Sequence, residues 1–165
     1  MRIAIQGQAG SFHEQAAKQW YGSDVTIVPC MTFGDVFQAY ARSKADAVVV
    51  AVENTIYGTI NETYRHIESC SAPVVGEVTL TIQQTLITNP GTKLEDITAV
   101  YSHPVALSQC HQFLQERLPQ AAQIEYFDTA GAVEFIKQQG SPHLAAIASE
   151  AAAQLYNMPI LKRHI

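Results

Sequence analysis

The chain has 165 residues, of which 47% are apolar and 15% charged, and its formal net charge is −5. This length allows one ordinary domain or two small lobes, and the composition excludes a disordered chain. The acidic balance, without any Lys/Arg cluster, makes nucleic acid and anionic membranes poor partners, and no apolar run approaches the roughly 20 residues that span a bilayer.

The first part of the chain predicts alternating strands and helices. Strands are expected at residues 2–6, 25–28 and 48–52, and helices at 14–20, 33–43 and about 59–69. Three such alternations with short links predict a parallel sheet with right-handed crossovers. We expect the third helix to turn Ile60, Tyr64 and Ile67 inward.

Residues 48–52 are an unbroken run of valine and alanine. Such a run is typical of a strand that is buried on both faces in a parallel sheet. It stops at Glu53, and the polar residues Asn54 and Thr55 follow. Because ligands of open α/β sheets bind at the carboxyl ends of the strands, this polar tip is predicted to face a ligand.

Residues 73–88 break the helix–strand rhythm. Val78, Leu80 and Ile82 alternate with polar residues at period two, which indicates a long extended segment that crosses between two lobes. The second half then repeats the order of the first. Strands are expected at 98–101, 123–127 and 144–148, helices at 130–139, 151–156 and from Pro104, and a last extended piece from Ile160. We therefore predict an α/β fold with lobes at 1–76 and 77–165 and crossing segments at 73–88 and 158–165.

Small hydroxyl or amide side chains stand where the predicted strands meet the following helices. Each of them, taken alone, is typical of a helix N-cap. Together they could line a cleft with hydroxyls and free backbone N–H groups, which suits the binding of carboxylates. They supply no nucleophile–base pair. These residues are Ser11, Asn54, Thr55, Ser102, Thr129 and Ser149.

Two histidines and one glutamate are candidates for orienting a ligand. His13 and His103 stand at predicted helix starts. Glu53 is either a hydrogen-bonded structural anchor or a buried carboxylate, whose pKa burial would raise. No histidine pair has the spacing of a zinc site, so no metal is expected.

Three cysteines, Cys30, Cys70 and Cys110, are far apart and form no CxxC motif. Such cysteines are typical of reduced thiols. The first residues, Met1 and Arg2, lead directly into a predicted strand rather than into a signal peptide. We therefore expect a cytoplasmic protein.

Five blocks, in this order, resemble the catalytic domain of the prephenate dehydratase family. The glycine turn has Gln-Gly where many members have Gly-Pro, and the second block has threonine at position 55 for the common serine. The third block is similar to "SHPxALxQC", the fourth to "STAxA" and the fifth to "AAIAS…AA…Y". The blocks lie at residues 5–13, 46–58, 101–110, 128–132 and 145–156.

The resemblance implies two α/β lobes like those of type II periplasmic binding proteins, with the substrate between them, and a homodimer. It implies that prephenate, a small anion, loses carbon dioxide and its ring hydroxyl to give phenylpyruvate in phenylalanine biosynthesis. Aromatisation drives that reaction, so no cofactor or metal is implied. The substrate contacts that we infer are Asn54, Thr55, Ser102, Thr129 and Ala130, followed by Ser11.

The family's Thr-Arg-Phe motif follows the "AAIAS" block on a strand that returns to the first lobe, and residues 1–165 do not contain it. No catalytic residue is therefore assigned within these residues. The family's phenylalanine-sensing domain is not found here either. We expect weak dehydratase activity or none. The alternative is a non-catalytic module that binds an aromatic or keto acid.

Overall fold

The computed structural model describes all 165 residues, which form two compact units. The first unit comprises residues 1–8 and 12–81, and the second comprises residues 9–11 and 82–165. The boundary at Thr81 and Ile82 falls inside the predicted crossing segment of residues 73–88. No helix has both the length and the apolar content that crossing a membrane requires.

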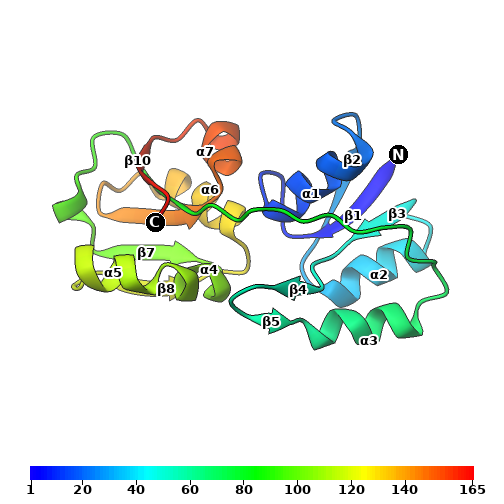
Figure 1. Cartoon of the computed structure of the whole chain (residues 1–165). Coiled ribbons are helices and arrows are strands. Elements are labelled where there is room, and N and C mark those ends of the chain that lie inside the picture. Colours follow the sequence, from blue (N-terminus) through cyan, green and yellow to red (C-terminus); the bar gives the residue numbers. More distant parts are fainter. The chain divides into compact units, whose positions relative to one another are not determined.

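A parallel sheet of three strands forms the centre of the first unit, as predicted (Figure 1). Its strands are β1 (Arg2–Gln6), β2 (Thr26–Cys30) and β3 (Ala47–Val49), in the order β2-β1-β3. Helix α1 (Phe12–Tyr21) packs Ala17 against the face that carries Ile3 and Ile5. Helix α2 (Phe33–Ala41) packs Val36 against Ala4 on the other face.

The prediction that residues 48–52 form a strand buried on both faces is wrong. Strand β3 ends at Val49, and all three of its residues are only half-buried. The physical reason is its position, because β3 pairs with β1 alone and forms an edge of a narrow sheet. Valine fits such a half-covered pleated surface as well as it fits a buried strand, so composition could not separate the two.

Helix α3 (Asn61–Ser69) begins two residues later than expected, because Gly58 and Thr59 form the short strand β5. Its buried face also differs from the prediction, since Thr63 is buried while Tyr64 is exposed. Residues at i, i+3 and i+7 share one helix face just as residues at i, i+4 and i+7 do.

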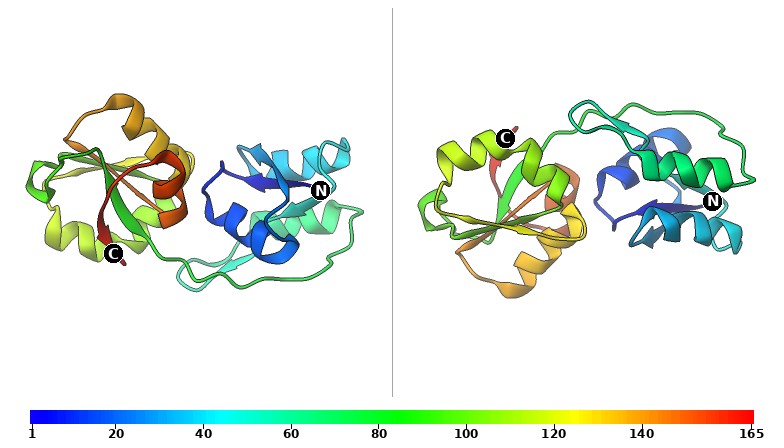
Figure 2. Two further views of the ribbon diagram at one scale, coloured as in Figure 1. Left: turned by 90° about the horizontal axis from the view of Figure 1, so that it is seen from above. Right: turned by 90° about the horizontal axis from the view of Figure 1, so that it is seen from below.

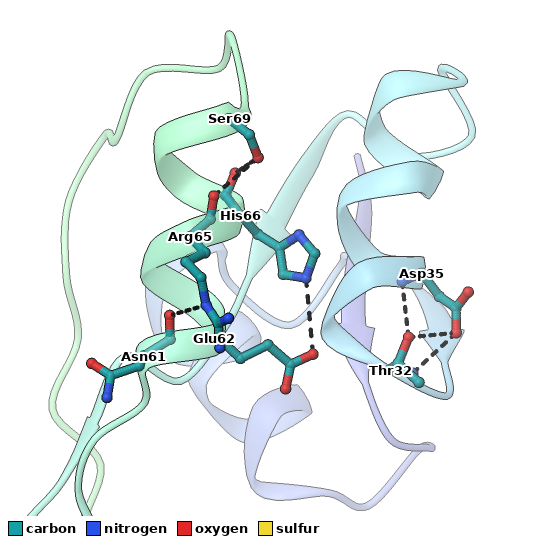
Figure 3. Close-up of polar contacts among 7 residues, drawn as sticks. All are labelled: Thr32, Asp35, Asn61, Glu62, Arg65, His66 and Ser69. Atoms are coloured by element: carbon teal, nitrogen blue, oxygen red, sulfur yellow. Dashed lines mark hydrogen bonds and ion pairs between the residues drawn. The ribbon is translucent and has the colours of Figure 1, made fainter.

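Helices α2 and α3 are fastened by local polar contacts and ring packing (Figure 3). Thr32 and Asp35 form the predicted capping box at the start of α2. On α3, the His66 ring stacks on Phe37 with centroids 5.3 Å apart, and its Nε2 lies 3.8 Å from Glu62. His66 therefore has a packing role.

Residues 70–84 connect α3 to β6 without pairing to any strand, and they appear as a long green connection in Figure 2. The predicted alternation is nevertheless present, because Val78, Leu80 and Ile82 are half-buried and the residues between them are exposed. Period-two burial here reflects an extended chain lying along a surface.

The second unit is a five-stranded mixed sheet with helices on both faces (Figure 1). The strand order is β10-β6-β9-β7-β8; β7, β8 and β9 are parallel, β6 is antiparallel to β9, and β10 is antiparallel to β6. The predicted strands and helices of this half are confirmed, with shifts of one or two residues at several ends. The strands are β6 (Thr85–Thr88), β7 (Ala99–Ser102), β8 (Ala122–Glu125), β9 (Leu144–Ala148) and β10 (Ile160–Arg163), and the helices are η1 (Leu94–Asp96), α4 (Pro104–Gln109), α5 (His111–Arg117), α6 (Thr129–Gln139) and α7 (Glu150–Tyr156).

Alternate residues of the β strands supply two cores in this unit. Ile147 and Val100 belong to the core that includes α4 and α5, while Ala146 and Ala148 belong to the core that includes α6 and α7. Both faces are covered, so the carboxyl edge of β7, β8 and β9 is where the helices begin.

Candidate functional site

Three helices start at the carboxyl edge of the parallel strands in the second unit. Helix α4 follows β7, α6 follows β8, and α7 follows β9. The first N–H groups of a helix have no partner within it, and the helix dipole adds positive potential there. The longest of these helices, α6, presents the most regular start. This edge is our candidate site, and its residues fall into distinct roles.

Ser102 is completely buried at the end of β7. Its hydroxyl donates to the carbonyl oxygen of Ile147 at 2.6 Å, which links β7 to β9. Because the hydroxyl proton is engaged there, Ser102 could offer a ligand only an acceptor.

Ser149 is also buried and caps α7 as predicted. Its hydroxyl accepts from the backbone N–H of Ala152 at 3.0 Å and donates to the carbonyl oxygen of Gly10 at 2.7 Å. Ser149 therefore fixes residues 9–11 at the start of α7, within the second unit. The neighbouring Ser11 is buried as well.

The start of α6 carries a carboxylate of the chain itself. Asp128 is buried, and its Oδ1 accepts from the backbone N–H of Gly131 at 2.6 Å. Ala130 is buried, while Thr129 is half-buried and so the more accessible of the two. Their own N–H groups have no partner within the helix. A ligand carboxylate at this helix start would approach beside the negative charge of Asp128.

His103 caps α4, and its Nδ1 accepts from the backbone N–H of Val105 at 3.3 Å. Burial lowers the pKa of His103, and the nearby carboxylates of Asp128 and Glu125 raise it by a smaller amount. The ring is therefore neutral at pH 7, with its proton on Nε2 because Nδ1 accepts.

We predict that the imidazole of His103 titrates with a midpoint below 6.5. Since the unfolded chain binds this proton more readily, stability should rise with pH between the folded pKa and 6.5, and should be lost as the pH falls through that window. Histidine proton resonances followed by NMR give the midpoint. The His103→Asn variant keeps a capping acceptor and removes this titration, so its stability should depend less on pH. A midpoint at or above 6.5 would contradict the prediction.

In the first unit, the predicted polar tip is a hairpin of β4 (Glu53–Asn54) and β5. The Asn54 Oδ1 accepts from the backbone N–H groups of Ile56 at 3.0 Å and Tyr57 at 3.1 Å. Its amide NH₂ remains available, and Thr55 is exposed. Glu53 is exposed too, so the alternative of a buried carboxylate at this position does not hold.

His13 lies in α1 and connects this helix to the chain after β3. Its Nε2 accepts from the backbone N–H of Ala51 at 3.3 Å, and its ring meets Phe33 edge-on at 5.9 Å. These contacts give His13 a role in positioning the segment that leads to Asn54.

Sequence reasoning missed a pair of amides at the candidate edge. Gln84 is buried directly before β6, and its Nε2 donates to Oε1 of Gln109, the last residue of α4, at 3.0 Å. Two adjacent glutamines before a buried strand interrupt the period-two pattern of the preceding residues. That interruption was the available signal.

Surface hollows lie elsewhere. One of about 370 Å³ is lined by residues of α5 and β8 such as Leu118 and Gln123, and another of about 430 Å³ lies between β2 and α2 near Cys30. Neither includes a predicted site residue. No three His, Cys, Asp or Glu side chains gather to form a possible metal site.

Comparison with protein families gives a match along nearly the whole chain. The model of the prephenate dehydratase family matches residues 3–165. The bifunctional chorismate mutase/prephenate dehydratase of Escherichia coli K12 is 40% identical over 98% of the chain, which spans 42% of that relative. Arogenate dehydratase 2 of Petunia hybrida is 36% identical over the whole chain and 41% of its own length. The chain thus spans less than half the length of these relatives.

Two solved structures are similar over the whole chain. Prephenate dehydratase from Arthrobacter aurescens, solved in complex with L-Phe, has a TM-score of 0.89 with 26% identity, and 55% of its chain is covered. GqqA, described as a novel type of quorum-quenching acylase, has a TM-score of 0.86 with 30% identity, and 59% of its chain is covered. The predicted α/β architecture is therefore confirmed.

Proposed function

The chain belongs to the prephenate dehydratase family of phenylalanine biosynthesis, whose enzymes are carbon–oxygen lyases, and from this premise we propose that it binds prephenate for dehydration to phenylpyruvate. The observation that carries the proposal is the family match over residues 3–165. The helix starts of the second unit support it, because free N–H groups suit the carboxylates of the substrate.

The reaction breaks two bonds of prephenate. The ring carboxylate leaves as carbon dioxide, and the electron pair of that bond enters the ring as the ring hydroxyl departs and takes up a proton to form water. Aromatisation drives these steps, so the protein has to orient the substrate and support the departing hydroxyl. Neutral donors such as Nε2–H of His103 and the N–H groups of α6 suit that task.

We propose specific contacts on this basis. In the second unit these are Thr129 and Ala130 through the start of α6, with His103 beside them and Ser102 and Ser11 behind them. In the first unit Asn54 would donate from its amide NH₂, and Thr55 would follow. Glu53 and His13 would act through the placement of Asn54.

Asn54 offers a sharp test, because the Asn54→Asp variant keeps the oxygens that the hairpin amides need and adds a negative charge. If Asn54 contacts anionic prephenate, binding should weaken by about tenfold or more through charge repulsion. Isothermal titration calorimetry with prephenate measures this loss.

The control for charge alone is Asn157→Asp at the far end of α7, which should bind prephenate like the unaltered chain. Equal binding by Asn54→Asp would remove Asn54 from the site. No binding of prephenate by the unaltered chain would contradict the proposed function itself. Following phenylpyruvate by ultraviolet absorbance on the same samples then separates an enzyme from the alternative binding module.

The relatives leave the keto acid prephenate and the amino acid arogenate as the two substrates to compare, and we infer prephenate from the match to the E. coli protein. Acyl hydrolysis gains no support from the second unit, because its buried hydroxyls, Ser102 and Ser149, donate to backbone carbonyls rather than to a histidine. The three free cysteines suit a reducing compartment, so we infer a cytoplasmic location. The homodimer implied by the resemblance stays a prediction for light scattering.

A further inference from the structure

The amide pair Gln84–Gln109 has features that the fold does not explain. Both residues belong to the second unit, and Gln84 directly precedes Thr85, whose Cα partner is Ala148 at the carboxyl end of β9. The backbone of Gln84 is fixed, since its carbonyl oxygen accepts from the N–H of Ile165 at 3.2 Å. The pair therefore lies at the same edge as the helix starts.

One hydrogen bond joins the two amides and leaves each of them incomplete. Gln84 Nε2 donates to Gln109 Oε1 at 3.0 Å, while Gln84 Oε1 is buried without any hydrogen-bond partner. Gln109 is half-buried, and its own NH₂ group makes no hydrogen bond within the chain. A buried carbonyl oxygen without a donor costs free energy, so such groups in native proteins are normally satisfied by something.

The chemistry of the missing partner follows from the two open positions. The pair presents one open acceptor and one open donor, and turning both amides over only exchanges which glutamine carries which. A carboxylate could satisfy the donor alone, and an ammonium group the acceptor alone. A hydroxyl group satisfies both at once, because it accepts and donates.

We propose that Gln84 and Gln109 form a subsite for a hydroxyl group of the substrate, which under the proposed function is the ring hydroxyl that leaves. The NH₂ group of Gln109 donates to the hydroxyl oxygen, and the hydroxyl donates to Gln84 Oε1. Gln84 also positions Gln109 through the amide–amide hydrogen bond. This inference rests on the proposed function for the identity of the substrate.

The test compares two ligands that differ in the hydroxyl. Prephenate carries it and phenylpyruvate does not. The Gln84→Met and Gln109→Met variants keep the side-chain length and lose the polar atoms. Each should bind prephenate about tenfold more weakly in calorimetry while binding phenylpyruvate like the unaltered chain.

The Gln84→Glu variant separates a hydroxyl from the substrate's ring carboxylate. It keeps the shape and an acceptor, so a bound hydroxyl leaves prephenate binding within a few-fold, whereas a carboxylate at this place would be repelled. Thermal unfolding confirms that each variant is folded.

Equal weakening of both ligands would show a merely structural pair and overturn the subsite, as would no change for either ligand or a loss of prephenate binding in Gln84→Glu. Each of these results would leave the proposed function standing. If the unaltered chain binds neither ligand, the proposed function fails and the subsite fails with it.

Discussion

Replacing Gly10 with alanine is expected to destabilise the second unit by about 3 kcal/mol, from positive-φ strain and overpacking together. Gly10 has a φ of +87°, which side-chain-bearing residues rarely adopt. A methyl group on Gly10 would also lie 3.0 Å from the Cα of Ala152 and 3.3 Å from its Cβ. The obstacle is helix backbone, which cannot rotate away as a side chain can.

The matched control is Gly91→Ala, where φ is +82° and nothing lies within 4 Å of the new methyl group. It pays the backbone strain alone, about 1 kcal/mol. Urea denaturation followed by circular dichroism gives both values, and hydrogen exchange at α7 reports the local effect. Equal losses for the two variants would show that close approach to Ala152 does not matter.

Replacing Ile147 with alanine should cost about 3 to 4 kcal/mol, within the range for large-to-small changes in a core. Ile147 has no exposed surface and lies in the middle of the sheet, against residues of α4 and α5 such as Leu107 and Leu114. The neighbouring side chains are held by β9 and two helices, so they can close little of the cavity.

A graded series tests the mechanism. Ile147→Val should lose about 1 kcal/mol. Leu155→Ala on the exposed side of α7 should change stability by less than about 0.5 kcal/mol. Denaturation midpoints give the order, and hydrogen exchange of the β9 amides should follow it. A loss below about 1 kcal/mol for Ile147→Ala would contradict the description of this core.

The order of strands and helices could be predicted from the sequence, because it depends on short-range patterns. The capping boxes and caps at Thr32, Asp128 and Ser149 were predicted for the same reason, since an N-cap needs only residues that are close in the chain. The five motif blocks also carried the family. These features are local, and sequence states them directly.

Burial depended on tertiary structure. The valine run before Glu53 has the composition of a buried strand, but it forms a half-covered edge because the strand beside it is missing on one side. Thr63 rather than Tyr64 faces inward on α3, since two helix faces one residue apart fit the same pattern. Both outcomes are set by neighbours that lie far away in the chain.

The candidate site divides in the same way. The sequence determined which polar residues stand at the ends of strands, because strand ends and helix starts follow from local patterns. The structure decided how those residues are used: Ser102 and Ser149 donate to backbone carbonyls, Asp128 occupies the start of α6, and Gln84 meets Gln109. A hydrogen bond needs two groups within about 3 Å, and only the folded chain brings residues 25 to 139 positions apart to that distance.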